Sequence, residues 1–292
     1  MTDLHARPCR LDDAPAVAEL VNTAIAAGGG RGEFAVSEFE DELRRCEHTR
    51  ALFDPDGNMV AVGLVPRPPA GGDHVELIGG IHPAWRGRGL GRELLAWQLE
   101  RSAPWSAQVF ATVGDESAAA LYERLGFTPM RYFLEMSAPT GGGAPVPPGA
   151  AFDPARAQEL YRVHCDAFRG LWGYQERTFD EWADATVRAA SFRPDLARLA
   201  VDGDTITAYV LPYDRGSLYI GQVGTAAQYR RRGIATALLT EVLSAAAGAG
   251  FEQATLDADA ANPTGAPSVY ANAGFVVDQH VVVYRHEAQP AR

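Results

Sequence analysis

The sequence repeats itself once, and this duplication constrains the fold more than any other feature of the chain. Each half of the 292 residues begins with an apolar-periodic segment, at 12–27 and at 153–168. Both segments carry Asp near the start and Pro in the first turn, as helix N-termini prefer. Gly89 and Gly233 occupy matching places 144 residues apart. This register predicts two copies of one domain.

The order of predicted elements is the same in both halves. A hairpin with an Asp-Gly turn is predicted at Asp56-Gly57 and again at Asp202-Gly203. A strand follows at 75–81 and at 218–224, and each leads into a loop rich in Arg and Gly and then into a helix. A last strand is predicted to close each half. We therefore expect an α/β fold in which each half is a mixed, mostly antiparallel central sheet flanked by helices.

A stretch rich in Gly and Pro separates the halves. Residues 139–150 carry no charged side chain, which is typical of an extended linker. The predicted domains are therefore residues 1–138 and residues 151–288.

Composition narrows the class of function. The net charge of −11 disfavours nucleic acid and anionic membranes as partners, because binding them needs clustered positive charge. The three cysteines form no CxxC pair and the seven histidines have no metal-ligand spacing, so neither a disulfide framework nor a metal site is expected. The start of the sequence has no apolar signal segment, and no apolar run is long enough to span a membrane. These features predict a cytoplasmic protein, a monomer or a homodimer.

The Arg/Gly loop is the motif that indicates chemistry. In both halves it has the form Arg-x-x-Gly-x-Gly/Ala and lies between a predicted strand and a predicted helix. Small residues let the backbone approach a ligand, and successive N–H groups at a helix N-terminus favour a pyrophosphate, with Arg adding charge. One copy could be an ordinary surface turn, whereas two copies at matching repeat positions favour phosphate binding. The predicted binding residues are Arg86, Gly87, Arg88, Gly89, Leu90 and Gly91, and Arg230, Arg231, Arg232, Gly233, Ile234 and Ala235.

These loops resemble motif A of the GNAT superfamily of N-acetyltransferases, which binds the pyrophosphate of CoA. The segments 120–127 and 268–275 look like motif B of the same family. The resemblance covers nearly the whole chain, and the layout of two tandem GNAT-like domains is similar to that of the mycothiol synthases. It implies acetyl-CoA as cosubstrate, no metal, and transfer of an acetyl group to a primary amine, with a small molecule as the expected acceptor.

The resemblance also implies roles for single residues. In the family, the backbone of the strand before motif A holds the pantetheine arm and the thioester carbonyl, and this strand matches Gly79–Ile81 and Val223–Thr225. The motif B tyrosine donates a proton to the leaving thiolate, and it matches Tyr122 and Tyr270. The alternative for both tyrosines is a packed aromatic, and the two roles are compatible.

The identity of the general base stays open between the halves. Glu76 lies ten residues before Arg86, near the place where some family members carry a catalytic glutamate, although an outward-facing strand residue fits the pattern equally well. The second half has Ile220 at that position, which leaves Asp257, Asp259 or a water relay.

Two further differences favour the second half as the active one. It contains Asn262, and family members with this Asn-Pro run use the Asn to bind the pantetheine arm, whereas the first half has Asp115 there. Its segment 167–182 is rich in aromatic residues, which fits an acceptor pocket as well as a helix-packing cluster. The candidate acceptor-binding residues are Phe168, Trp172, Tyr174 and Glu176.

Two other classes of function stay open on the sequence. One is a non-catalytic acyl-CoA-binding sensor or scaffold, and the other is a protein N-acetyltransferase. The retained tyrosines favour catalysis, while the missing strand acid in the second half favours binding alone. The acidic charge of the chain suits a cationic acceptor.

Overall fold

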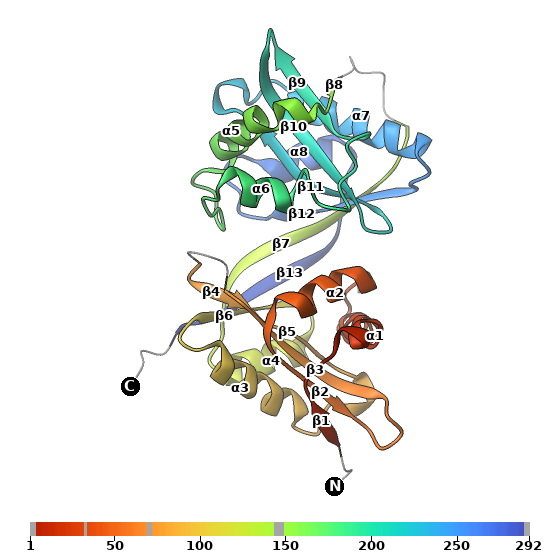
Figure 1. Cartoon of the computed structure of the whole chain (residues 1–292), viewed down its shortest axis with the longest axis vertical. Coiled ribbons are helices and arrows are strands. Elements are labelled where there is room, and N and C mark those ends of the chain that lie inside the picture. The colour runs from red at the N-terminus through yellow and green to blue at the C-terminus, as the bar shows by residue number, and fades with distance from the viewer. Residues whose placement is uncertain (1–3, 32–33, 69–71, 143–148, 289–292) are drawn as a thin grey trace. The chain divides into compact units, whose positions relative to one another are not determined.

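The structure is a computed structural model of the chain, and it describes residues 4–31, 34–68, 72–142 and 149–288 (Figure 1). The chain forms two compact units. The first unit comprises residues 1–132 and 279–292, and the second comprises residues 133–278. The unit boundaries therefore fall inside two strands, which differs from the boundaries expected at the Gly/Pro-rich stretch.

The first unit places its strands in the order β1-β2-β3-β5 and β4-β6-β13. Strands β1, β2, β3 and β5 are antiparallel, β4 runs parallel to β6, and β13 is antiparallel to β6. Its elements are β1 (His5–Arg7), η1 (Leu11–Asp13), α1 (Ala14–Ala27), α2 (Val36–Arg45), β2 (Cys46–Phe53), β3 (Met59–Pro66), β4 (His74–Glu76), β5 (Ile78–Ile81), η2 (Pro83–Trp85), α3 (Leu90–Ser102), β6 (Ser106–Thr112), α4 (Glu116–Arg124), the start of β7 (Thr128–Pro139) and most of β13 (Val276–His286).

The second unit places its strands in the order β8-β9-β10-β11-β12-β7. All neighbours are antiparallel except β11 and β12, which are parallel. Its elements are the rest of β7, β8 (Ala150–Ala151), η3 (Pro154–Arg156), α5 (Ala157–Phe168), α6 (Phe179–Ala185), β9 (Arg198–Asp202), β10 (Thr205–Asp214), β11 (Leu218–Thr225), η4 (Ala227–Tyr229), α7 (Ile234–Gly248), β12 (Gln253–Asp259), α8 (Ala266–Asn272) and the start of β13.

Helices cover both faces of the β1-β2-β3-β5 strands and of the second unit's sheet. In the first unit, alternate residues of β3 face opposite helices: Val62 and Leu64 pack with α1, while Gly63 lies against Leu94 of α3. In the second unit, β10 has eight consecutive buried residues, as expected for a strand buried on both faces. The mixed, mostly antiparallel sheet flanked by helices was predicted correctly. Within the described residues, no helix combines the length and the apolar character needed to cross a membrane.

The two units exchange their last strands. Residues 133–139 of β7 pair with β12 of the second unit, and residues 281–286 of β13 pair with β6 of the first. β7 and β13 run for 12 and 11 residues, so each strand is long enough to begin in one unit and end in the other.

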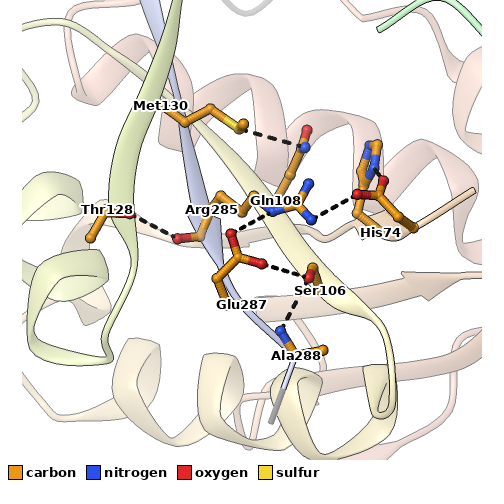
Figure 2. Close-up of polar contacts among 9 residues, drawn as sticks. His74, Ser106, Gln108, Thr128, Met130, Arg285, Glu287 and Ala288 are labelled. Carbon is orange, nitrogen blue, oxygen red and sulfur yellow. Dashed lines mark hydrogen bonds and ion pairs between the residues drawn. The ribbon is translucent and has the colours of Figure 1, made fainter. Parts of the chain in front are cut away.

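Polar contacts hold the exchanged segment of β13 in the first unit (Figure 2). The Arg285 guanidinium binds Asp73 at 2.8 Å, and the Ser106 hydroxyl donates to Glu287 at 3.1 Å. Thr128 donates through its hydroxyl to the Arg285 carbonyl at 3.5 Å. These contacts join residues more than 150 positions apart, so residues 285–287 are an integral part of the first unit.

The predicted linker is only partly described. Its residues 143–148 lie outside the described residues. On either side of them the chain is bound to the second unit: the Thr140 amide donates to the Glu252 carbonyl at 3.0 Å, and the Gly149 amide donates to the Glu241 carboxylate at 2.6 Å.

Candidate active site

In each unit the Arg/Gly loop joins a short 3-10 turn to the start of a helix. The residue just before the helix is a glycine in the left-handed region, Gly89 with φ 84° before α3 and Gly233 with φ 75° before α7. A side chain at either position would be strained, which explains the glycine. A Cβ atom built on either glycine would have no other atom within 4 Å, so the backbone here faces open space.

The second residue of the loop adopts the same left-handed conformation in both units. It is Gly87 with φ 76° in the first and Arg231 with φ 63° in the second. Arg231 is the one non-glycine residue with positive φ in the described part of the chain. Such a conformation costs on the order of 1 kcal/mol and is typical of functional sites. The second unit thus keeps the loop geometry at the expense of local strain.

The loops present a row of free amide groups. Glu93 is the first residue after its loop whose backbone amide donates a hydrogen bond, and the acceptor is the Gly89 carbonyl. In the second unit, the Ala237 amide donates to the Gly233 carbonyl in the same way. None of the amides at 87–92 or 231–236 donates to another group in the described part of the chain. Free amides at a helix N-terminus form an anion site, so both loops fit a pyrophosphate.

The side chain of the first arginine of each loop donates a hydrogen bond to a backbone carbonyl of the protein itself. The Arg86 guanidinium donates to the Ala24 carbonyl at 2.7 Å in the last turn of α1, and that of Arg230 donates to the Ala167 carbonyl at 3.0 Å in the last turn of α5. The expectation that these two side chains add charge at the rim of the site has no support in this geometry.

The third arginine of each loop stacks on an aromatic ring. Arg88 lies over Trp85 at 4.3 Å and Arg232 lies over Tyr229 at 5.2 Å. Both guanidinium groups also donate to a carbonyl four residues earlier, at 3.3 and 3.1 Å. Arg88 and Arg232 are exposed and their rings are half-buried, and the arrangement repeats in both units, so these arginines are charged groups at the edge of each loop.

The strand before each loop separates from its parallel neighbour. In the second unit, β11 pairs with β12 only through Leu218 and Tyr219. The register between β10 and β11 skips Gly221, which is a β-bulge. In the first unit the strand breaks at Leu77: β4 pairs with β6, while β5 pairs with β3 instead. A gap therefore opens in each unit beside residues 78–81 and 222–225, the segments predicted to hold a pantetheine arm.

The motif B tyrosines differ in how their hydroxyl groups are used. Burial raises the pKa of both to about 12, so both hydroxyls stay protonated at neutral pH. The Tyr122 hydroxyl donates to the Phe110 carbonyl at 3.4 Å. The Tyr270 hydroxyl has no hydrogen-bond partner among the described residues. Tyr270 belongs to α8, which packs against β12 and α7.

Of the two candidate bases in the second unit, Asp257 lies at the gap. It is on β12, and its carboxylate accepts a hydrogen bond from Tyr219 at 3.0 Å, across the point where β11 and β12 separate. Removal of water by the surrounding protein raises its pKa, although part of the side chain is exposed. Asp259 instead accepts from the Ala261 amide in the following loop.

Glu76 ends β4 in the first unit and lies within electrostatic range of α2. Desolvation is the main cause that raises its pKa, with Glu42 adding to the rise and His74 and Arg45 opposing it, even though the side chain is exposed. It stands opposite Gln108 of β6, at the start of the gap. The geometry is compatible with the role of a base, which stays a prediction.

Asn262 and Asp115 each accept hydrogen bonds from the chain just after them, Asn262 in the loop before α8 and Asp115 at the start of α4. The Asn262 side-chain oxygen accepts from the amide and the hydroxyl of Thr264 at 2.9 and 2.7 Å. Asp115 accepts from the Ser117 and Ala118 amides at 3.1 and 3.0 Å and caps α4. The difference is that Asn262 keeps an NH₂ group that can donate to a ligand, whereas the Asp115 carboxylate has none.

Two family models match the chain, one in each half. The acetyltransferase (GNAT) domain model matches residues 52–129, and the acetyltransferase (GNAT) family model matches residues 157–275. The chain belongs to the GNAT acetyltransferase family. It carries two GNAT acetyltransferase domains in tandem, and acetyl-CoA is the cosubstrate that this family uses.

Relatives agree with the tandem layout. A mycothiol acetyltransferase from Tsukamurella paurometabola is 32% identical over 191 residues, which are 59% of this chain and 61% of that protein, less than two thirds of its length. The structure of a GCN5-related N-acetyltransferase from Sphaerobacter thermophilus is 28% identical with a TM-score of 0.83, covering 99% of this chain and 97% of that one. A tandem GNAT protein from the clavulanic acid biosynthesis pathway shares the fold, at 17% identity and a TM-score of 0.72 over 99% of this chain and all of that one.

In the second GNAT unit, the predicted acceptor residues divide into two groups. Phe168 stacks on His164 at 4.6 Å between ring centroids, and Tyr174 lies 6.2 Å from the same ring. Trp172 instead contacts Phe133 of β7 at 5.6 Å. Glu176 is exposed in the same connection between α5 and α6.

Sequence reasoning missed three residues on this face. The His164 Nδ1 atom lies 2.9 Å from the Tyr209 hydroxyl, and Gln222 lies close enough to affect the pKa of His164. The sequence signal for Tyr209 was Gly224, its partner across the strands. A Cβ atom on Gly224 would lie 2.8 Å from the Tyr209 hydroxyl, so the glycine lets that side chain cross β11.

In the first unit, the chain that follows α1 packs tightly against its neighbours. A Cβ atom on Gly28 would lie 2.2 Å from Asp115, and one on Gly30 would lie 2.4 Å from Thr112. The chain after α1 therefore packs directly on the end of β6 and the start of α4. In the second unit, Cβ atoms on Gly170 and Gly173 would have nothing within 4 Å.

Replacing Gly233 with Asp is expected to abolish acetyl-CoA binding by the second unit while the chain stays folded. The change puts a side chain and a negative charge where free amides face a dianion. Calorimetry on the wild type should find one or two acetyl-CoA sites per chain, and the Gly233→Asp variant should lose one of them.

Gly203→Asp is the matched control for this experiment. Gly203 also has positive φ and open space around its Cβ position, but it lies in the β9–β10 hairpin turn. This variant should keep every site. Wild-type binding by Gly233→Asp would show that the loop is not the pyrophosphate site.

Proposed function

We propose that the chain transfers an acetyl group from acetyl-CoA to a primary amine of a small molecule, that the second unit carries this turnover, and that Tyr270 is its general acid. The observation that carries the proposal is the hydroxyl of Tyr270, which has no partner in the described chain and belongs to α8, the helix that packs against β12. The loop at 230–235, with its free amides, follows β11 and η4 in the chain and contains the first residues of α7.

Each chemical requirement of the transfer has a candidate group in the second unit. A nucleophilic amine must lose a proton as its nitrogen bonds to the acetyl carbon, and Asp257 is placed to take it. The carbon–sulfur bond breaks, and Tyr270 is placed to give its proton to the sulfur. Backbone amides of the free edge of β11 at 223–225 would bind the carbonyl oxygen, as in other oxyanion sites. Asn262 would hold the pantetheine arm through its free NH₂ group.

The first unit fits a sensor or scaffold role, in which it binds acetyl-CoA without rapid turnover. Its loop at 86–91 has the same open geometry as the second. The Tyr122 hydroxyl is engaged by a carbonyl, and Asp115 replaces the amide donor. Gly28 and Gly30 bring the α1–α2 connection down on the end of β6, on the acceptor side.

Release of CoA thiol during incubation with acetyl-CoA and a panel of primary amines tests the proposed function. Amine-dependent release that is lost in the Gly233→Asp variant supports turnover in the second unit. Binding of acetyl-CoA without release for any amine would instead support the sensor role for the whole chain.

The pH dependence of kcat/KM tests Asp257. Burial raises the pKa of Asp257, and the hydrogen bond from Tyr219 opposes that rise. Removing that bond in Tyr219→Phe lets the pKa of Asp257 rise further, so the proton acceptor is lost at a higher pH. The acid limb of the profile should therefore shift to higher pH in Tyr219→Phe and disappear in Asp257→Asn, measured with one amine throughout.

Asp259→Asn is the control, because Asp259 is the other acid considered for the role and bonds within its own loop. It should leave the acid limb in place. Loss of the limb in Asp259→Asn, with an unchanged profile in Asp257→Asn, would assign the base to Asp259.

A further inference from the structure

Gln98 of α3 is a buried polar side chain that bonds to the sheet beneath its helix. It is 3% exposed. Its NH₂ group donates to the Leu64 carbonyl of β3 at 2.9 Å and to the Ile78 carbonyl of β5 at 2.8 Å. The group carries two N–H donors, so it can serve both carbonyls, and a buried amide costs free energy unless it is paired. These two bonds, the Gln98 clamp, tie β3 and β5 together.

The clamp lies where the strand of the first unit changes its partner. The Leu77 amide still bonds to the Gln108 carbonyl of β6, at 2.8 Å. Ile78 is the next residue, and it pairs with Leu64 at the end of the ladder between β3 and β5. From Ile78 on, β5 pairs with β3 and is the last strand of that described sheet. The clamp therefore holds the first residue of β5 at the point where the support of β6 ends.

The register of β5 determines which of its backbone groups face the gap. In an antiparallel ladder, residues that bond to the partner strand alternate with residues whose N–H and C=O point away from it. The His82 amide donates to the Val60 carbonyl at 2.9 Å. Counting back from this pair, the backbone groups of Gly79 and Ile81 point away from β3, toward the gap. They belong to the segment predicted to hold the pantetheine arm.

The second unit holds the same place without a polar group. The counterparts are the residue ten positions before the loop glycine, the residue nine positions after it, and the ladder partner of the first of these. In the first unit they are Gly79, Gln98 and Gly63, and in the second unit they are Val223, Val242 and Val210. All three valines belong to one apolar cluster with other residues of α7.

The glutamine accompanies a break in the strand. In the second unit, β11 runs through Leu218–Thr225, whereas the strand of the first unit is divided into β4 and β5. A Cβ atom on Gly63 would lie 3.1 Å from Cδ of Gln98, so the glycine leaves room for the amide to reach the break. Glycine and glutamine thus occur together where a divided strand needs a further support.

The clamp also connects β5 to the phosphate loop. Helix α3 begins at Leu90, directly after Gly89, and Gln98 lies about two turns further along it. One helix therefore provides both the N-terminus that faces a pyrophosphate and the side chain that holds β5. This arrangement sets the spacing between the two parts of a bound acetyl-CoA.

We propose that Gln98 is a positioning residue of the acetyl-CoA site in the first unit. By holding the Leu64 and Ile78 carbonyls, it keeps the backbone groups of Gly79 and Ile81 directed at the pantetheine arm. This proposal rests on the part of the proposed function in which the first unit binds acetyl-CoA, and it does not depend on which unit carries turnover. Gln98 should contribute to binding of the arm and not to binding of the phosphates.

Calorimetry on the full chain carrying Gly233→Asp tests the proposal, because only the first site is expected to bind there. The probes are acetyl-CoA and adenosine 3′-phosphate 5′-diphosphate, which is the nucleotide part of CoA without the arm. Adding Gln98→Met keeps the length of the side chain and removes both donors. The affinity for acetyl-CoA should fall by about 3- to 10-fold, the worth of one hydrogen bond to the arm. The affinity for the nucleotide should not change.

Two further variants accompany this test. Gln158→Met makes the same change at an exposed glutamine of α5 and should leave both affinities unchanged. Gln98→Glu is the conservative variant, since a buried carboxyl stays protonated to a higher pH than usual and its protonated form donates one hydrogen bond. Its affinity for acetyl-CoA, relative to the chain with Gln98 at the same pH, should recover as the pH is lowered.

The possible results separate positioning from folding and from turnover. Equal loss of both probes in Gln98→Met, and in Gln98→Glu at every pH, would show that Gln98 supports only the fold, and would overturn the proposal. Unchanged acetyl-CoA binding in Gln98→Met would overturn it as well, because β5 would then keep its register without the clamp. The assay contains no acceptor, so a failure of acetyl transfer to every amine would overturn the proposed turnover and leave this result standing.

Discussion

Residues 1–138 expressed alone are expected to give no folded monomer, and residues 151–288 alone are expected to behave in the same way. The first fragment lacks the part of β13 that pairs with β6 and supplies Val282 and Tyr284 to the core. The second lacks the part of β7 that pairs with β12 and supplies Met136 and Ala138. Each fragment loses several buried side chains and leaves a long hydrophobic strand edge, which favours aggregation.

The two fragments produced together should restore the fold. A nicked chain cut between residues 142 and 149 contains both exchanged strands, so it should remain one particle with a single cooperative unfolding transition. Size-exclusion chromatography and circular dichroism measure this, with the intact chain as the control. A soluble, cooperatively folded monomer of residues 1–138 would contradict the exchange. A dimer of that fragment would be compatible with it, since two copies could exchange β7.

The duplication made much of the fold predictable. Hairpin turns at Asp56-Gly57 and Asp202-Gly203 are where the sequence placed them, with φ of 88° and 58° at the two glycines. The helices after the Arg/Gly loops begin one residue after Gly89 and Gly233. Such features depend on neighbours in the chain, and the second copy removes most of the ambiguity of a single short motif.

The strand exchange was not predicted, because the halves show the same pattern whichever partner the last strand takes. β7 and β13 run for 12 and 11 residues, longer than the usual ~5 to 6, but strand length does not select a partner. The choice of partner depends on contacts with residues from the other half, which a local pattern does not contain.

The parts of the site that depend on local backbone conformation or on the family motifs were predictable. The glycines of the loops and the tyrosines of motif B follow from local rules and from the family resemblance. The cluster of aromatic side chains around His164 was not predicted, because it depends on Tyr209 crossing β11 and on the bulge at Gly221. The role expected for Arg86 also had no support, since a tertiary contact with the Ala24 carbonyl uses that side chain.

Tyr270→Phe is expected to lower kcat by about 10²- to 10⁴-fold, the usual cost of losing a general acid. The affinity for acetyl-CoA should change little, because the variant removes one hydroxyl that has no partner in the described chain and leaves the loop at 230–235 untouched. Thermal stability should also be close to that of the wild type. Steady-state kinetics with a reactive amine, or slow hydrolysis of acetyl-CoA in its absence, would measure the effect.

Tyr122→Phe is the matched control, since it makes the same change at the equivalent position of the first unit. It removes only a long hydrogen bond to the Phe110 carbonyl, so kcat should stay within a few-fold of the wild type. The reverse result, a severe loss in Tyr122→Phe and a mild one in Tyr270→Phe, would make the first unit the active one. Glu76, whose pKa is raised at the start of the gap between β5 and β6, would then be the leading candidate for the base. Comparable losses in both variants would show that both units turn over, in which case the packing of Gly28 and Gly30 on the end of β6 does not exclude the acceptor.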